Sequence, residues 1–352
     1  MAASPQSATQ PPQTDPTLIF EHFRGSYGTE LLTVAVAHFN LFGQLATGSK
    51  RFDELRQDLQ LEPRPANVLV TALLAMQLIR RTPDDRIELT PMAAEHLTPG
   101  TTFDVSDYVG LAAMAPGVVE MAERLRTNRP AGVDEEDGAA FIYRDGIKSA
   151  MESEALARHF TMALAGRAKN VAPLMAARVP LNGATRILDI GGGTGIYSIA
   201  MLQKHPQLSA VVLDRAEVLK VAAEMAEEYG VVDRLELLEG DMFSDPLPTD
   251  CQLVLLSNIL HDWDVPQCKQ LVQRSADVLP HGGRVLIHDV FLDDDLGGPL
   301  PIALYSAALF TLTEGRAYSQ SEYRSWMHEA GLKTEAMIPT LVHCGIVPGT
   351  KS

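Results

Sequence analysis

The segment 186–195, Arg-Ile-Leu-Asp-Ile-Gly-Gly-Gly-Thr-Gly, decides the fold of this 352-residue chain. Its first five residues read as a short apolar strand, and an apolar segment of helix length follows the glycines at 196–205. Glycines at a strand–helix turn let a ligand approach the backbone closely, and the N–H groups at the helix start face that ligand. The segment therefore predicts a ligand site at the end of a strand.

Four more apolar segments follow at the spacing of an alternating strand–helix pattern, at 209–214, 234–240, 252–258 and 283–290. Near-continuous apolar strands separated by helices are typical of a parallel sheet that is covered on both faces. We therefore predict an α/β domain at 181–352 with a Rossmann-like, doubly wound, mostly parallel sheet.

The preceding half of the chain reads differently. Residues 1–16 are small, polar and proline-rich, which predicts a disordered tail. Residues 17–105 contain helical segments and then a turn at Pro83-Asp84-Asp85 between two short extended pieces, the pattern of a winged helix. Because the third of these helices is apolar around much of its circumference, we interpret this region as an all-α dimerisation domain of a homodimer rather than a DNA reader. Residues 106–180 read as a helical connector that contains an acidic loop at 132–138.

The net charge of the chain argues against some classes of binding partner. Lys and Arg number 29 against 45 Asp and Glu, so the formal net charge is −16. That balance opposes nucleic-acid binding and docking on an anionic membrane. No apolar run reaches the roughly 18 residues of a membrane span and no signal peptide begins the chain. Three cysteines, without zinc-type spacing, fit a reducing compartment, so we expect a cytoplasmic protein.

Three strand ends together indicate which ligand the sheet binds. The glycine turn fails the dinucleotide pattern G-x-G-x-x-G and lacks the lysine of a P-loop. A carboxylate, Asp189, stands just before the turn, where it would repel a pyrophosphate and attract a cation such as the sulfonium of S-adenosylmethionine. Asp214 ends the next strand, where a carboxylate can bridge ribose hydroxyls. Asp241 and Met242 follow the third strand and suit the edge and face of adenine.

The run ILDIGGGTG…VVLD…EGDMF…NILHDWD…GGRVLIHD resembles the S-adenosylmethionine-dependent O-methyltransferases of the caffeate and hydroxyindole type, with bacterial tailoring relatives in secondary metabolism. The resemblance covers nearly the whole chain and implies S-adenosylmethionine as cofactor and S-adenosylhomocysteine as product. Plant members carry a cofactor-binding lysine where Ser257 stands here. The residues expected at the cofactor are Asp189, Gly191, Gly193, Asp214, Arg215, Asp241, Met242 and Ser257.

His261 is the candidate general base. It lies just beyond the fourth strand, where open α/β sheets bind ligands, and histidine titrates near the pH at which a phenol must lose its proton. The sulfonium needs no metal. Resemblance implies a carboxylate partner at Asp289, whereas His288 is expected to point to the other face of the strand.

The second glutamate of the family motif is replaced by Ala317. Three readings stay open: Asp289 alone orients His261, Glu314 or Tyr318 compensates, or the reaction is methylation at carbon or nitrogen, or no methyl transfer at all. We expect an aromatic acceptor in a pocket lined by Phe160, Leu164 and Phe310, because these side chains are apolar. A ligand-sensing DNA-binding regulator is a further alternative, which the net charge opposes.

Overall fold

The computed structural model describes residues 5–129 and 154–352, which divide into two compact units. Of the described residues, unit 1 comprises 5–20, 154–291 and 320–352. Unit 2 comprises the described residues 21–129 together with Leu292–Ser319. The acidic loop predicted at 132–138 lies outside the described residues.

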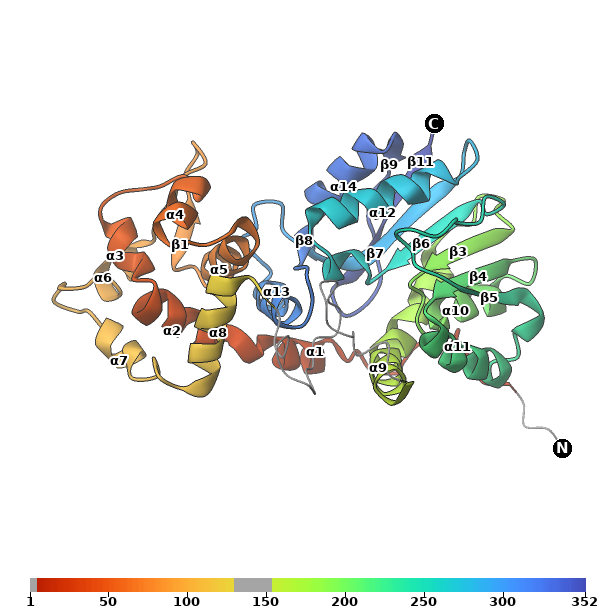
Figure 1. Ribbon diagram of the computed structural model, residues 1–352, viewed down its shortest axis with the longest axis horizontal. Helices are drawn as coiled ribbons and strands as arrows, with labels where there is room; N and C mark the ends of the chain where they lie inside the picture. Colours follow the sequence, from red (N-terminus) through yellow and green to blue (C-terminus); the bar gives the residue numbers. More distant parts are fainter. Residues whose placement is uncertain (1–4, 130–153) are drawn as a thin grey trace. The chain divides into compact units, whose positions relative to one another are not determined.

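Unit 1 is built on a sheet whose strands run in the order β10-β11-β7-β6-β3-β4-β5 (Figure 1). The five strands from β7 to β5 are parallel, and β11 pairs with β7 in the antiparallel sense. This confirms the predicted α/β class. The strands are β3 (Arg186–Ile190), β4 (Ser209–Asp214), β5 (Leu235–Glu239), β6 (Leu253–Ser257), β7 (Arg284–Leu292), β9 (Leu332–Thr334), β10 (Ile338–Pro339) and β11 (Cys344–Lys351).

The strand order reverses at β3, because β4 and β5 extend the sheet on one side of it and β6 and β7 on the other. In open parallel sheets, ligands bind in the crevice at the carboxyl ends of the strands where this reversal occurs. The helices of unit 1 are α9 (Glu154–Arg178), which packs on α10 (Ile196–Lys204) and α11 (Ala216–Glu228), and α12 (Val265–Asp277), which packs on α14 (Gln320–Glu329).

Residues 5–16 are predicted to be a disordered tail, but in the structure part of this segment is hydrogen-bonded to unit 1. The backbone N–H of Gln6 donates to the carbonyl of Glu228 at 3.0 Å, and the N–H of Ala8 donates to Oε1 of Gln203 at 2.7 Å. Ala8 is buried. Polar, proline-rich composition predicts that a segment cannot form its own core, but this one gains hydrogen bonds from helices that are already folded.

Unit 2 contains the predicted winged-helix elements, including the strand pair β1–β2 with its turn at residues 82–86. Helix α1 (Thr17–Arg24) contains the boundary between the units. The elements are α2 (Gly28–Thr33), α3 (Leu41–Ala46), α4 (Phe52–Asp58), α5 (Pro63–Ala75), β1 (Ile79–Arg81), β2 (Ile87–Leu89), α6 (Pro91–His96), α7 (Ser106–Gly110), α8 (Pro116–Thr127), α13 (Leu300–Leu312) and β8 (Tyr318–Ser319).

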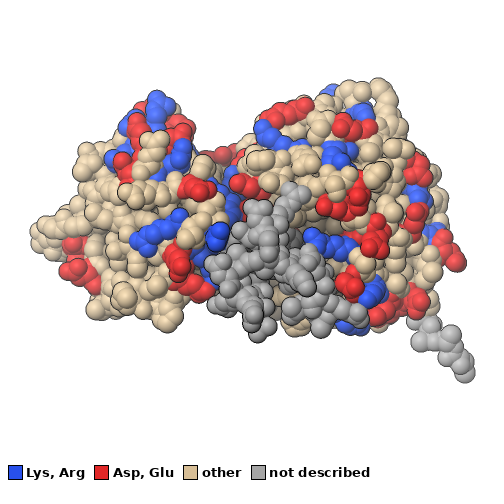
Figure 2. Space-filling view, viewed as in Figure 1, with Lys and Arg blue, Asp and Glu red and all other residues tan. Residues whose placement is uncertain are grey.

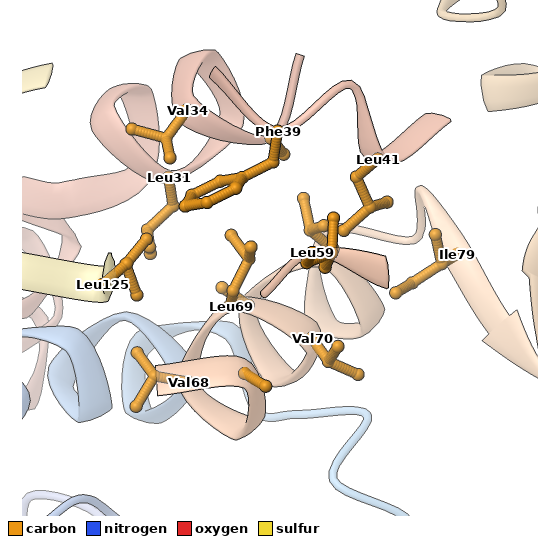
Figure 3. Close-up of a cluster of buried hydrophobic side chains, with 14 of the residues drawn as sticks. Leu31, Val34, Phe39, Leu41, Leu59, Val68, Leu69, Val70, Ile79 and Leu125 are labelled. Atoms are coloured by element: carbon orange, nitrogen blue, oxygen red, sulfur yellow. The ribbon is translucent and has the colours of Figure 1, made fainter. Parts of the chain in front are cut away.

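The core of unit 2 gathers around α5 (Figure 3). Val68, Leu69 and Val70 are buried there against side chains of α2 and α8, among them Leu31 and Leu125. In a DNA-reading winged helix, the third helix presents its side chains to the major groove. Because nearly every position of α5 is buried within unit 2, this helix serves packing instead. Figure 2 shows acidic and basic side chains interspersed on the visible face of the unit.

Helix α13 also belongs to the core of unit 2, through Leu304, Ala307 and Phe310. By its place in the sequence, this helix is predicted to belong to the domain at 181–352. The helix is apolar on all sides, and such a helix requires a surrounding core, which α5 supplies here. Among the described residues, no helix is long and apolar enough to cross a membrane.

Candidate active site

The glycine turn follows β3 directly and depends on left-handed backbone. Gly191 has φ 65°, and a Cβ on it would lie 2.4 Å from Cδ1 of Ile259. Gly193 has φ 59°, and a Cβ there would meet no atom within 4 Å, so this glycine borders open space. Its N–H donates to Oδ2 of Asp214 at 2.9 Å. The turn therefore links the ends of β3 and β4 while leaving its own backbone accessible.

Asp189 lies fully buried beside this turn. Ser198 on α10 donates its hydroxyl to Oδ2 at 2.7 Å, whereas Oδ1 is buried and has no hydrogen-bond partner within the described part of the chain. Burial raises the pKa of Asp189 to about 7, against the opposing hydrogen bond from Ser198. A buried carboxylate oxygen without a donor is costly, and a cationic ligand group would relieve that cost.

Asp214 and Arg215 lie at the end of β4. Oδ1 of Asp214 accepts the N–H of Arg215 at 2.8 Å, and burial raises the pKa of this carboxyl. The side chain of Arg215 is exposed. Asp214 is half-buried, so part of its carboxylate is open to a ligand at the edge of the sheet.

The third strand end supplies the predicted polar and apolar pair. Asp241 is exposed and accepts the N–H of Phe243 at 2.7 Å, while Met242 is half-buried. The rings of Phe243 and Trp263 pack edge to face with centroids 4.8 Å apart. These residues fit a nucleoside carrying a positive charge: a buried carboxylate, an open glycine and a second carboxylate lie at adjoining strand ends.

His261 and Asp289 form a buried pair, as the sequence analysis expects. Nδ1 of His261, in the single turn Leu260–Asp262 after β6, lies 2.6 Å from Oδ1 of Asp289 on β7. Asp289 also accepts the N–H of Val290 at 2.8 Å. The carboxylate of Asp289 can only accept a hydrogen bond, so neutral His261 carries its proton on Nδ1. In that tautomer, Nε2 is the nitrogen that can accept a proton.

Two carboxylates determine the charge of this histidine. Burial lowers the pKa of His261, but Asp289 and Asp262 together outweigh it and raise the pKa above its ordinary value. Oδ1 of Asp262 lies 3.7 Å from Nε2. Burial opposes ionisation of Asp289, yet contact with His261 and hydrogen bonds from Tyr323 and Val290 lower its pKa. The pair therefore rests as a carboxylate beside an imidazole that readily holds a proton.

Tyr323 is a member of this site that the sequence analysis did not identify. Its hydroxyl, from α14, donates to Oδ2 of Asp289 at 2.9 Å. In the sequence, an aromatic residue three positions before Trp326 reads as the apolar face of a helix. Only the packing of α14 brings the hydroxyl to β7, so no local pattern could have indicated it.

His288 and Ser257 belong to a separate buried network. Nδ1 of His288 lies 2.8 Å from Oγ of Ser257, and its Nε2 lies 3.2 Å from Oγ1 of Thr340. Burial lowers the pKa of His288 to about 3, so this imidazole is neutral. Because successive residues of a strand face opposite ways, His288 points away from His261, as predicted. Ser257 is nine-tenths buried and engaged with His288.

The predicted substrate residues have different surroundings. On α9, Phe160 is half-buried with its ring edge-on to His159, and Leu164 is exposed. Phe310 is fully buried in the core of unit 2, with the guanidinium of Arg64 at 4.7 Å from its ring centroid. Phe310 thus packs in this core, and its predicted place at a substrate pocket stays a prediction. The apolar composition of α13 could not separate the two roles.

Ala317 is also fully buried in unit 2, where its N–H donates to Oγ of Ser306 at 3.1 Å. Arg64 stabilises the preceding loop by donating to the carbonyls of Thr313 and Gly315 at 3.0 and 3.2 Å. The guanidinium of Arg316 lies over the ring of Tyr318. The loop that carries the position of the missing glutamate is therefore held both by Arg64 of α5 and by contacts among its own residues.

Comparison with known proteins identifies methyltransferases as relatives of this chain. A family model described as an O-methyltransferase domain matches residues 130–333. The chain is 36% identical to a 3-hydroxy-5-methyl-1-naphthoate 3-O-methyltransferase of Streptomyces sahachiroi, over 94% of this chain and 93% of that protein. It is 26% identical to an L-tyrosine C(3)-methyltransferase of Streptomyces lavendulae, over 85% and 82%. A solved O-methyltransferase family 2 protein of Planctomyces limnophilus, in complex with apigenin, superposes with a TM-score of 0.90 at 45% identity, over 99% and 100%.

Proposed function

Because this chain belongs to the O-methyltransferase family, we propose that it transfers the methyl group of S-adenosylmethionine to a hydroxyl of a small aromatic metabolite. The observation that carries the proposal is the buried His261–Asp289 pair, at the edge of the same sheet as the carboxylate-fronted glycine turn. S-adenosylmethionine supplies an activated methyl group on a cationic sulfur and leaves S-adenosylhomocysteine as the product.

The cofactor residues divide into charge partners and backbone. The orphaned Oδ1 of buried Asp189 offers a partner for a positively charged group, and open Gly193 allows close approach to the turn. The carboxylate of Asp214, with Arg215 next to it, is available for ribose hydroxyls. Asp241 and Met242 offer an edge and a face for adenine. Gly191 gives the turn its shape. Ser257, at the end of β6, is proposed at the cofactor from the family resemblance, and its hydroxyl binds His288.

His261 is the proton acceptor of the mechanism we propose. A phenolate is a far stronger nucleophile than a phenol, so removal of the hydroxyl proton raises the rate. Nε2 accepts that proton, while Asp289 stabilises the imidazolium that forms and holds Nδ1–H in place. Positioning of the acceptor oxygen supplies much of the remaining acceleration.

The acceptor class rests on apolar side chains and on relatives. Phe160 and Leu164 on α9 present apolar surface, and the relatives' names include a hydroxynaphthoate as substrate and apigenin as a bound molecule. A second candidate is methylation at carbon. Ala317 in place of the motif glutamate favours it, together with the similarity to a tyrosine C(3)-methyltransferase.

A transfer assay separates the two candidates. The enzyme is incubated with methyl-labelled S-adenosylmethionine and pairs of phenols and their O-methyl ethers, and the products are identified by mass spectrometry and NMR. O-methylation predicts that phenols are labelled on oxygen and that the ethers are inert. Labelling of ring carbon, in ethers as well as phenols, would support the second candidate.

We also propose that the protein forms a homodimer through unit 2. Tyr108, Leu111 and Met114, in α7 and the turn after it, are each at least 77% exposed, and Phe103 lies nearby in the sequence. Contiguous exposed apolar side chains mark interaction surfaces. Light scattering at micromolar concentration should give twice the chain mass, and Leu111→Asp should reduce it to one chain. A monomer mass for the unaltered protein would contradict this.

The three buried thiols, Cys251, Cys268 and Cys344, support placement in a reducing cytoplasm.

A further inference from the structure

Both oxygens of the Asp289 carboxylate accept hydrogen bonds. Oδ1 accepts Nδ1–H of His261 at 2.6 Å and the N–H of Val290 at 2.8 Å. Oδ2 accepts the hydroxyl of Tyr323 at 2.9 Å. Three donors from three segments therefore converge on one carboxylate, and Tyr323 supplies the one that reaches the oxygen not engaged by His261.

This carboxylate is almost completely excluded from water, with 1% of Asp289 exposed and none of Tyr323. An ionised carboxylate is costly in such surroundings unless hydrogen bonds compensate its charge. A hydrogen bond to an ionised group is roughly twice as strong as one between neutral groups. The Tyr323 hydroxyl is therefore a strong determinant of how much negative charge Asp289 presents to His261.

The phenol ring cannot turn away easily. The ring packs edge to face against two other rings. Its centroid lies 5.6 Å from that of Phe291, with an interplanar angle of 86°, and 5.3 Å from that of Trp326, with an angle of 89°. Such edge-to-face contacts fix a ring in one orientation. Because the hydroxyl lies in the plane of a fixed ring, it aims at Oδ2 before any ligand is bound.

Other charged groups act on the pair as well. Asp262 faces His261 from the same turn, and His288 adjoins Asp289 on β7. Arg167, on α9, acts on His261 and on Asp262. His288 is neutral, and Asp262 and Arg167 do not contact Oδ2. Among the described side chains, removal of the Tyr323 hydroxyl therefore changes the hydrogen bonding of Asp289 directly and leaves the number of charges at the site unchanged.

We propose that Tyr323 is a positioning residue that orients Asp289 through Oδ2 and withdraws charge from it, and so sets the basicity of His261. The proposal rests on the proposed role of His261. Without the hydroxyl, Asp289 would keep its charge concentrated on the oxygen that faces Nδ1–H. The imidazolium would then be stabilised more strongly, and His261 would become harder to deprotonate after it accepts a proton.

The test is the titration of His261 by NMR in the full-length protein labelled at histidine. His261→Ala identifies the resonance. Tyr323→Phe removes only the hydroxyl and keeps the ring contacts, and Tyr229→Phe, a buried tyrosine of unit 1 away from the site, is the matched control. We expect the pKa of His261 to rise by about 0.5 in Tyr323→Phe, and to remain unchanged in the control. No shift, or a shift downward, would overturn the proposal.

A second variant tests the proposal even if Tyr323→Phe fails to fold. Replacing Tyr323 by 3-fluorotyrosine keeps ring and hydroxyl but makes the phenol a stronger donor, so the pKa of His261 should move in the opposite direction, downward. An unchanged or raised pKa there would also overturn the proposal.

The activity readout distinguishes this inference from the proposed function. The acid limb of the kcat–pH profile should shift upward with the NMR pKa in Tyr323→Phe, which corresponds to about a three-fold lower kcat on that limb, with KM for the cofactor unchanged. Retained turnover in His261→Ala would refute the base role, whereas the NMR shift would still establish the coupling. A purely structural role of Tyr323 would lower thermal stability without moving either pKa.

Discussion

Nδ1 of His261 lies 2.6 Å from Oδ1 of Asp289, and both side chains are at least 95% buried. A histidine whose one ring nitrogen is bound to a carboxylate, so that the other nitrogen can accept a proton, is the arrangement of a general base. The aspartate is one methylene shorter than the glutamate that the family resemblance implies, yet it reaches the imidazole. Strands β6 and β7 are adjacent and parallel, with Ser257 paired to His288, so the turn after β6 lies next to Asp289.

Asp289→Asn should reduce kcat at least about ten-fold, because the amide cannot stabilise an imidazolium as a carboxylate does. The pKa of His261 should fall, since Asp289 is one of the charges that raise it. The measurement is kcat against pH, with Asp233→Asn, an exposed aspartate of unit 1, as control. Activity within two-fold of the unaltered enzyme would exclude Asp289 from the mechanism.

Cofactor affinity should depend on pH through Asp189. Its pKa is raised to about 7 by burial, so this carboxyl is largely protonated in the ligand-free protein below pH 7. A cation favours the ionised form, so binding should release a proton, and the affinity should weaken about ten-fold or more between pH 7.5 and 5.5. Calorimetry in buffers of different ionisation enthalpy measures both quantities. Asp189→Asn should bind weakly and without this slope; an equal slope in the variant would assign the effect elsewhere.

Ser257→Ala should destabilise the protein by about 1–3 kcal/mol, because Nδ1 of buried, neutral His288 loses its partner. Urea unfolding at pH 7 reports this change, and Ser244→Ala, at an exposed serine, should leave the midpoint unchanged. An unaltered midpoint for Ser257→Ala would mean that the His288 network contributes nothing measurable to stability.

Much of the fold follows from the order of strands and glycines in the sequence. The five parallel strands lie within two residues of the predicted ranges, because short apolar runs bounded by turn residues and separated by helix-length segments are typical of buried parallel strands. The pairing of His261 with Asp289 is implied by the family resemblance, and the structure places the two side chains 2.6 Å apart, from the turn after β6 and from β7. These features depend on local pattern and on topology, which sequence reasoning handles well.

The remaining features depend on packing between distant segments. Tyr323 contributes its hydroxyl to Asp289 only because α14 lies against β7, and its sequence pattern indicates a core residue. Phe310 is apolar on a helix that is apolar all round, so no face distinguishes a pocket from a core. The segment around Gln6 and Ala8 has no apolar periodicity, and its order comes from hydrogen bonds to α10 and the end of α11.

Ala317→Glu tests whether the missing glutamate is needed. Ala317 is fully buried in unit 2, so the new carboxylate should cost about 2 kcal/mol or more and lower the midpoint of thermal unfolding. We expect no gain in the methylation of phenols, because Asp289 already binds His261. Ala317→Ser, a small polar replacement, serves as control. A several-fold faster transfer by Ala317→Glu would show that the base is incompletely supported in this enzyme.

The most direct test of the account is the single-turnover rate of methyl transfer by His261→Ala, measured with saturating S-adenosylmethionine and a phenol that the unaltered enzyme methylates. Calorimetry on the same samples gives the cofactor affinity. If His261 is the general base, the rate should fall at least about a hundred-fold while the cofactor affinity stays within a factor of two or three. Full-rate transfer by this variant would contradict it.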